Sequence, residues 1–534
     1  MPTSIARSIV IALAAALVVA CSGAPTAGPA GGASATATPV AKVRMQDDGT
    51  TGTPKSGGRL KMLIRLDATE LDPHKTNETS SYLVNESTYE SLLEAVSGEI
   101  KASLAESWTV TPDGLAYTFK LRPNVKFHSG RPLTSADVKY SIERIMDAAT
   151  ASPRRANYAG INTIETPDAS TAVFKLRTPF APFLALMATS GASIVDKGVV
   201  DAGGLNGAVD GGTGPFVVKE RVKGQQIVLD KNPSYWRSGM PYLDGITITF
   251  NPDDNARTAA VKSGTVDFLW RAAPEFIESL KADSNLKWYG GIGSLSLHMV
   301  VNTKKKPFDD VRVRQAIFHA LDRDQILAVA NSGLGTTLKA GYLPPDRWGS
   351  IKEPIYDRPD TAKAKALLTE AGYPTGFKTT LLVISTSAFQ VRSAEAEQQQ
   401  LKAIGIDVEL KPVEATVANP AIAAGNFDMY QSGFSMTLDP DEIFSRAFLS
   451  TGGNNYGKWS DPEYDALIVK ARAQTDRAER EKTYQQAERI LATRGPAAMT
   501  WASADFDVVQ KKVMGYKGDP TPGYRFYREL WLNQ

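Results

Sequence analysis

Alternating apolar and polar residues predict several strands in the first half of the chain. In Arg59–Leu66 the even-numbered residues are all apolar, which is typical of a strand with one buried face. The other segments expected to form strands are Tyr117–Leu121, Val173–Leu176, Ile227–Leu229, Ile246–Phe250 and Val266–Trp270. The tetrapeptide Phe-Lys-Leu-Arg occurs at 119–122 and at 174–177. Because nothing around it repeats, it indicates two similar strands rather than a duplicated domain.

Apolar residues spaced three and four apart predict helices, which dominate the second half. In the first half, one helix is expected over Ser80–Ala95, another starts at a capping box of Thr134 and Asp137, and a third covers Asp254–Gly264. The second half has expected helices at Asp310–Ala330, Thr361–Ala371, Val391–Ile404, Pro462–Ala473 and Arg477–Arg494, with strands at Leu381–Ile384, Ile406–Leu410 and Phe427–Ser432. This mixture predicts α/β domains with some antiparallel pairing.

The N-terminal segment has the pattern of an export signal. A basic residue, Arg7, is followed by an apolar run over residues 9–20. Such a run suits a signal-peptide core but is shorter than the roughly 20 residues of a membrane-spanning helix. Val18-Val-Ala-Cys21 has the form of a bacterial lipobox. We therefore expect residues 1–20 to be a lipoprotein signal peptide and Cys21 to be lipidated; the alternative is a buried free cysteine.

Residues 21–55 have a composition that disfavours folding. They are rich in Gly, Pro, Ala, Ser and Thr and contain no aromatic residue. Such a segment buries too little apolar surface to offset the entropy lost on ordering, so we expect a disordered tether. The ordered body is expected to begin near Ser56.

Composition excludes several classes of function. The 60 basic and 58 acidic residues nearly balance, which gives no electrostatic basis for nucleic-acid binding. Cys21 is the single cysteine, so intramolecular disulfides and cysteine-based metal sites are excluded. At 534 residues with 42% hydrophobic residues, two or more domains are expected. No later apolar run approaches 18 residues, so the body is expected to be soluble.

Motifs for catalysis are missing from the sequence. The four histidines form no HExxH pattern, and the chain has no GxSxG, CxxC or phosphate-binding GxxxxGK[ST] motif. The glycine-rich Gly211–Phe216 is expected to be a tight turn before a strand. The acidic Asp439–Glu442 either caps a short helix through Phe448 or forms a ligand-facing rim. We therefore expect a binding protein rather than an enzyme, without cofactor or metal.

Several segments, in order along the chain, carry a family resemblance. The most specific is Leu104–Arg144, LAESWTVTPDGLAYTFKLRPNVKFHSGRPLTSADVKYSIER; the others include Ser56–Thr76, Leu229–Trp236, Val313–Ile326, Ala364–Phe377, Leu401–Glu414, Phe427–Phe434 and Trp459–Ala473. Together they resemble the family 5 bacterial extracellular solute-binding proteins. These are the substrate-binding lipoproteins of ABC importers for peptides, oligopeptides or nickel.

The resemblance implies an α/β fold with two lobes that close on a ligand, similar to type II, cluster C periplasmic binding proteins. Lobe I would comprise residues 56–298 and 500–534, with an inserted subdomain at about 87–205. Lobe II would comprise 299–499. The chain would cross the hinge near 298–302 and 499–503. A ligand that contacts both lobes favours the closed state.

The resemblance also implies which residues face the ligand. In lobe I these are the loop residues Asn77, Glu78 and Thr79. In lobe II they lie on and after one strand: Gln431, Gly433, Phe434, Ser435, Thr437 and Asp439. Backbone groups of Gly433 and Ser435 would pair with a peptide main chain, and Phe434 would stack on the cleft wall.

One position departs from the family pattern. Thr437 stands where peptide binders often have the aspartate that pairs with the ligand's α-amine, and a hydroxyl cannot neutralise a buried ammonium. Either Asp439 replaces that aspartate, or the ligand lacks a free amine, as in an oligosaccharide, opine or metal chelate. Peptides are the leading expectation.

The implied partners follow from this family. A peptide or other small solute would be passed to ABC permease subunits and their ATPase. The protein would be an exported monomer, held by its lipid anchor at the outer face of the cytoplasmic membrane or in the periplasmic space.

Overall fold

The computed structural model describes residues 52–533 except 97, 206–209, 436–437 and 518–524. The expected signal peptide, Cys21, most of the tether and Thr437 lie outside the described residues. Within them, no helix has the length and apolarity needed to cross a membrane.

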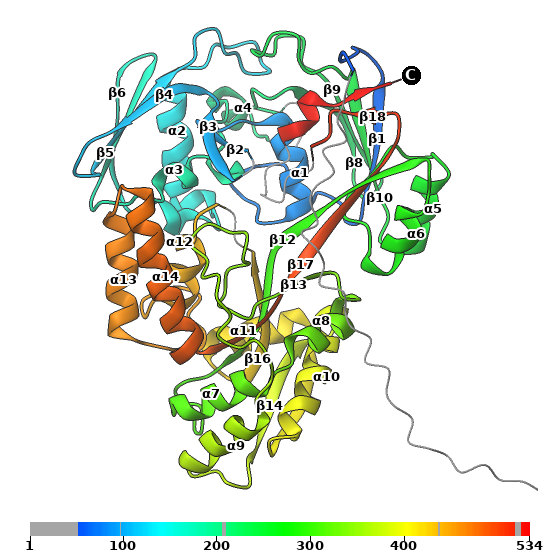
Figure 1. Ribbon diagram of the computed structural model, residues 1–534. Coiled ribbons are helices and arrows are strands. Elements are labelled where there is room, and N and C mark those ends of the chain that lie inside the picture. Colours follow the sequence, from blue (N-terminus) through cyan, green and yellow to red (C-terminus); the bar gives the residue numbers. More distant parts are fainter. Residues whose placement is uncertain (1–51, 97, 206–209, 436–437, 518–524, 534) are drawn as a thin grey trace, which may run out of the picture. The chain divides into compact units, whose positions relative to one another are not determined.

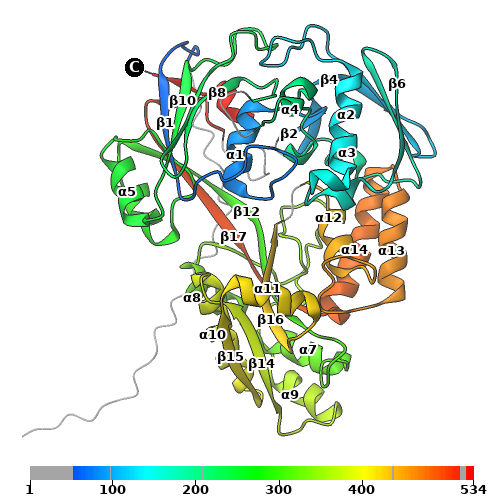
Figure 2. The ribbon, with the colours of Figure 1, turned by 180° about the vertical axis from the view of Figure 1, so that it is seen from behind.

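A mixed sheet is the largest element of the described part, with 11 strands. Its order is β15 (Ile406–Val413), β14 (Phe377–Ile384), β16 (Met429–Ser435), β12 (Leu286–Val301), β17 (Ala497–Gln510), β11 (Phe268–Leu269), β1 (Arg59–Ile64), β10 (Gly245–Phe250), β9 (Gln226–Lys231) and β8 (Phe216–Val222), and β13 (Gly335–Thr337) pairs with β17. The long strands β12 and β17 run antiparallel side by side (Figures 1 and 2). They connect the strands of the first half with those of the second.

The second half surrounds its strands with helices (Figure 2). They are α7 (Val311–Ala320), α8 (Arg323–Asn331), α9 (Thr361–Glu370), α10 (Ala388–Lys402), α11 (Ala415–Ala424), α12 (Asp441–Ile443), the π-helix η5 (Phe444–Phe448), α13 (Pro462–Ala473) and α14 (Arg477–Arg494). Both α13 and α14 have the predicted bounds. One buried cluster, which includes Leu381, Ile317 and Leu401, joins β14 to α7 and α10.

The expected single helix over Asp310–Ala330 is wrong, because the chain breaks it between α7 and α8. Leu321 has an extended backbone, and the Asp322 side chain accepts a hydrogen bond from the Gln325 amide at 3.0 Å. An aspartate that satisfies a free amide in this way starts a new helix.

A smaller sheet in the first half has the order β4 (Ala105–Val110), β5 (Ala116–Leu121), β7 (Thr171–Leu176) and β6 (Ile161–Asp168). The two Phe-Lys-Leu-Arg segments belong to β5 and β7, which pair antiparallel. The helix α2 (Ser135–Met146) begins at the predicted capping box of Thr134 and Asp137. Further short elements are α3 (Phe183–Leu186), α4 (Lys197–Asp201), α5 (Asp254–Lys262) and α6 (Ile277–Lys281).

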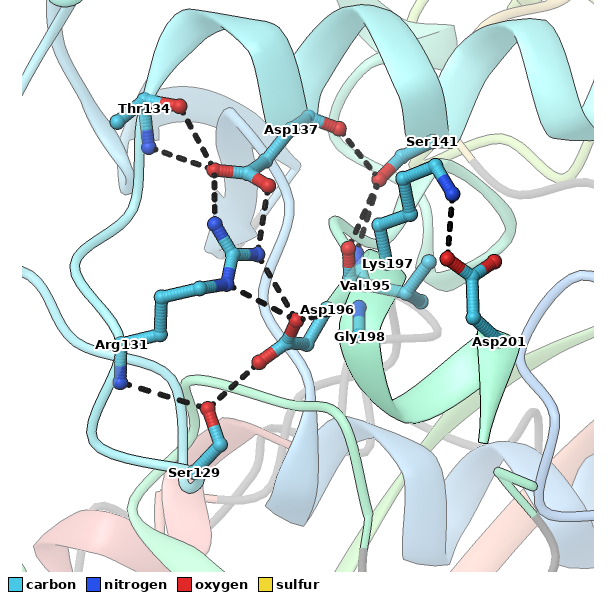
Figure 3. A network of polar contacts seen from close by, with 10 residues as sticks. All are labelled: Ser129, Arg131, Thr134, Asp137, Ser141, Val195, Asp196, Lys197, Gly198 and Asp201. Atoms are coloured by element: carbon cyan, nitrogen blue, oxygen red, sulfur yellow. Dashed lines mark hydrogen bonds and ion pairs between the residues drawn. The ribbon is translucent and has the colours of Figure 1, made fainter. Parts of the chain in front are cut away.

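Arg131 joins the start of α2 to the start of α4 (Figure 3). Its Nη2 donates to Asp137 at 2.6 Å and to Asp196 at 2.9 Å. Asp137 also accepts from the Thr134 amide, and Asp196 accepts from the Gly198 amide. One guanidinium thereby fixes both capping carboxylates.

The expected helix Ser80–Ala95 is also too long. The helix α1 covers Thr79–Thr88, and the chain continues into β2 (Leu93–Val96), which pairs with β3 (Glu99–Ala102). The Gly214 amide donates to the Thr88 carbonyl at 2.9 Å, so the glycine-rich segment packs on the end of α1. The strand predicted to follow this segment is confirmed, because β8 begins at its last residue, Phe216.

The C-terminal segment returns to the first half. After β17 come β18 (Val513–Met514), the 3-10 helix η6 (Arg525–Glu529) and β19 (Trp531–Leu532). Val513 and Leu530 belong to the same buried cluster as Leu60 of β1. The domain limits expected from the sequence stay a prediction.

Candidate functional site

A pocket of about 410 Å³ lies between two parts of the chain that are far apart in sequence. One wall comes from residues 154–189 and includes Arg154, Asn157, Phe180, Leu186 and Thr189. The other comes from residues 439–453 and Arg472, and it includes Asp439, Glu442, Ser445 and Arg446. The volume is in the range of small-molecule sites, and the lining combines apolar side chains with a few charged ones.

Arg472 holds the two walls together. Its guanidinium donates two hydrogen bonds to the Asp441 carboxylate, at 2.8 and 3.0 Å. It also lies 5.5 Å from the centre of the Phe180 ring, and its carbonyl accepts from the Ala181 amide at 2.8 Å. Figure 1 shows α13, which carries Arg472, below α3. The wall formed by residues 154–189 is thereby fixed to α13 by a contact between the guanidinium and the Phe180 ring and by a backbone hydrogen bond from Ala181.

Arg154 links the first wall to the loop expected to face the ligand. Its Nε donates to the Tyr82 hydroxyl at 2.7 Å, and that hydroxyl donates to the Thr76 carbonyl at 2.6 Å. Burial disfavours the charged guanidinium, but the nearby Tyr82 and Glu442 outweigh this, so the pKa of Arg154 is raised. Arg154 therefore carries a positive charge at the pocket and positions the residue before Asn77.

The expected lobe I residues lie at the surface around the start of α1. Asn77, Glu78 and Thr79 are exposed. The Glu78 carboxylate accepts hydrogen bonds from the Thr69 and Ser81 hydroxyls, which hold this loop in place. None of the three is among the residues that line the pocket; the hydrogen bonds from Arg154 to Tyr82 and from Tyr82 to Thr76 connect the pocket to the residue before them.

Asp439 lines the pocket, but its carboxylate is already engaged. It accepts from Arg480 Nη2 at 2.5 Å and from the Asp441 amide at 3.0 Å. Burial raises the pKa of Asp439, and the attraction of Arg480 offsets this only in part. The segment that follows is helical through Phe448, as predicted, but its N-cap residue is Pro440, which makes no side-chain capping hydrogen bond.

The expected ligand-facing strand is β16, and its side chains alternate between two faces. Gln431 is buried and donates to the Glu397 carboxylate of α10 at 3.2 Å, so its carboxamide is used inside the fold. Phe434 points to the other face, where its ring centre lies 5.8 Å from the Arg446 guanidinium carbon. Gly433 and Ser435 pair with Leu297 and Leu295 of β12.

The structure therefore places Asp439 at the pocket and Phe434 next to one of its lining residues, Arg446. The Gln431 side chain instead bonds to Glu397 inside the fold. Thr437 lies outside the described residues. Sequence reasoning missed Arg154, Arg446 and Arg472. The only local signal was for Arg446, which follows Glu442 by one helical turn directly after the singled-out acidic segment.

Comparison with known proteins identifies the fold and family. The family model for bacterial extracellular solute-binding proteins, family 5, matches residues 99–456. The glutathione-binding protein GsiB of Escherichia coli K12 is 29% identical over 474 residues, which cover 86% of this chain and 91% of that protein.

Two solved structures extend the comparison. The periplasmic binding protein DppA of Helicobacter pylori, in complex with the peptide STSA, is 30% identical with a TM-score of 0.78 and covers 90% of this chain and 99% of its own. AgaA of A. tumefaciens R10, in complex with agropinic acid, is 30% identical with a TM-score of 0.77 and covers 89% and 99%. The α/β fold expected from the sequence, that of a periplasmic binding protein, is confirmed. The chain belongs to the family 5 bacterial extracellular solute-binding proteins.

Proposed function

We propose that this protein is the substrate-binding lipoprotein of an ABC importer, and that it captures small peptides and delivers them to a membrane permease. The observation that carries the proposal is the pocket between residues 154–189 and 439–453, whose walls bring charged and aromatic side chains together. A ligand that contacts both walls would stabilise their approach, since only differential contact shifts such an equilibrium. The peptide complex of the similar DppA supports this class of ligand.

The same pocket supports a second class of ligand, amine-poor solutes. The pairing of Asp439 with Arg480 favours this alternative, because a carboxylate held by a guanidinium has less charge to offer an ammonium. The similar AgaA is in complex with agropinic acid. Ligands of this second class would be an oligosaccharide, an opine or a metal chelate.

The proposed assembly has no catalytic step. The protein would be exported, held by a lipid on Cys21, and would act as a monomer beside permease subunits and their ATPase. The predicted tether 21–55 would let the body dock and release. Asn77, Glu78, Thr79, Gly433, Phe434 and Ser435 remain the proposed ligand contacts.

Thermal unfolding of the full-length protein with defined solutes tests the proposal. One series contains di- to hexapeptides and glutathione, and the other contains opines and oligosaccharides. A ligand at 100 times its Kd adds about 2.7 kcal/mol to the free energy of unfolding, which raises the melting temperature measurably. A rise with peptides supports the first class. A rise confined to the amine-poor solutes supports the second, and no rise with either series contradicts solute capture.

A further inference from the structure

The pocket contains three arginines whose charges are balanced in different ways. Arg472 forms a two-bond ion pair with Asp441. Arg154 donates to Tyr82 and lies near enough to Glu442 for that carboxylate to help raise its pKa. Arg446 has no ion pair with any residue of the described part of the chain. Among the three arginines, Arg446 is therefore the one whose charge can pair with an anionic group of a ligand.

In the described part of the chain, Arg446 lacks a hydrogen-bond partner for one of its donors as well as an ion-pair partner. Its Nε is buried and makes no hydrogen bond within the described residues. A buried donor without a partner costs free energy, and more so when it belongs to a charged group. A ligand oxygen that accepts from this donor would remove that cost, so binding gains both the new bond and the relief of the unpaired group.

The backbone holds Arg446 in a fixed position. It lies in the π-helix η5, a rare form of helix that occurs frequently at functional sites. The Asn454 amide donates to the Arg446 carbonyl at 2.9 Å, and a side chain at Gly452 would come within 2.5 Å of that same oxygen. The following loop therefore packs closely on η5 and limits how far the backbone of Arg446 can move.

The Arg446 guanidinium also makes a cation–π contact with an aromatic ring. Phe434 of β16 lies 5.8 Å from it, a distance at which a cation is attracted to the ring. The contact with the ring uses no N–H donor of the guanidinium, and those donors match the two oxygens of a carboxylate.

We propose that Arg446 is a specificity-determining residue that binds a carboxylate of the solute, so that the pocket selects acidic over neutral ligands of the same size. The assignment rests on the proposed function, because it names the chemistry of the ligand taken by that pocket. The carboxylate comes either from the C-terminus of a peptide or from an acidic side chain, and the two sources are separable by experiment.

The experiment is calorimetric titration of the full-length protein with four probes. Ser-Thr-Ser-Ala as the free acid is compared with its C-terminal amide, which isolates the terminal carboxylate. Ser-Thr-Glu-Ala amide is compared with Ser-Thr-Gln-Ala amide, which isolates a side-chain carboxylate. We expect the acidic member of at least one pair to bind about 10- to 100-fold more tightly, the range for a hydrogen bond to a charged group.

Three variants connect this preference to the residue. Arg446→Gln should bring the affinities of the acidic and neutral members together, whereas Arg446→Lys, which keeps the charge but not the planar fork, should retain part of the difference. Arg358→Gln is the matched control, because the Arg358 side chain is 88% exposed and lies outside the pocket lining. It should preserve the preference in full.

The outcomes separate the two proposals. Binding of acidic and neutral members with equal affinity by the unmodified protein overturns the role of Arg446 and leaves peptide capture standing. A preference that survives Arg446→Gln overturns it as well. If none of the four probes binds, peptide capture fails and this assignment fails with it. Equal affinities for acidic and neutral members on the unmodified protein overturn the proposal even if the variants do not fold.

Discussion

Arg480 Nη2 donates a 2.5 Å hydrogen bond to the Asp439 carboxylate and so joins α14 to the segment after β16. Both side chains are largely buried, with 9% and 11% of their surfaces exposed. The Arg480 guanidinium also donates to the Tyr484 hydroxyl at 3.1 Å and lies 5.1 Å from the Trp348 ring centre. The acidic segment that lines the pocket is therefore held to α14 by the ion pair between Asp439 and Arg480.

Removing one partner of this pair should destabilise the protein. Arg480→Met leaves the Asp439 charge buried without compensation, for which we expect a loss of about 3–5 kcal/mol in the free energy of unfolding. Urea unfolding followed by tryptophan fluorescence measures it. The double variant Asp439→Asn with Arg480→Met should recover part of the loss.

Arg489→Met on the same helix is the control. The Arg489 side chain is 55% exposed and lies 3.5 Å from Glu353, an exposed pair expected to contribute less than about 1 kcal/mol. Equal losses for Arg480→Met and Arg489→Met would show that the Asp439 contact has no special role.

Close packing at Gly214 predicts a second effect on stability. A Cβ there would lie 2.6 Å from the Thr88 carbonyl carbon, so Gly214→Ala must push β8 away from the end of α1. We expect a loss of about 1–3 kcal/mol, as for overpacked cores, in the same urea assay. Gly160→Ala, where a Cβ meets nothing within 4 Å, should change stability much less. An unchanged midpoint for Gly214→Ala would contradict the tight contact.

Glu397 predicts a dependence of stability on pH. Burial raises its pKa to about 8 in the folded protein, above the ordinary value of 4.5. The folded state then holds a proton that the unfolded state has released, so this contribution is present below pH 4.5 and is lost as the pH rises toward 8. Glu397→Gln should reduce the change in urea midpoint between pH 5 and pH 8 without abolishing it, because burial also raises the pKa of Glu488 to about 8. A variant whose midpoint falls as steeply as that of the unmodified protein would rule out Glu397 as the source.

The proposed anchor predicts a change of location without a change of binding. Cys21→Ala should move the protein from the membrane fraction to the soluble fraction, because the proposed lipid attachment point is removed. Immunoblotting of the two fractions detects the shift. Affinity for any solute found by thermal unfolding should stay the same, and a loss of affinity would refute the separation of anchor from binding body.

Local signals in the sequence predicted much of the secondary structure. The bounds of α13 and α14 follow from apolar spacing and from capping aspartates, since Asp461 and Asp476 each accept from amides in the first turn. The capping box at Thr134 is present as predicted. These features depend on residues three or four positions apart, which the sequence displays directly.

Other elements depend on partners that are distant in the chain. The helix α11, which contains Pro420, was not predicted, and α1 is shorter than predicted because Gly214 packs on its last residue. The strand β11 is only two residues long, because its neighbours β1 and β17 pair with it over that length alone.

The sequence by itself determined the α/β class, the family resemblance, most helices and the acidic segment at Asp439. Only the tertiary structure decided which charges neutralise each other. Asp439 pairs with Arg480 and Asp441 pairs with Arg472, while Arg446 lies over the Phe434 ring without a carboxylate partner among the described residues. The physical reason is that an ion pair requires two side chains within a few ångströms, and residues tens of positions apart reach that distance only after the helices have packed.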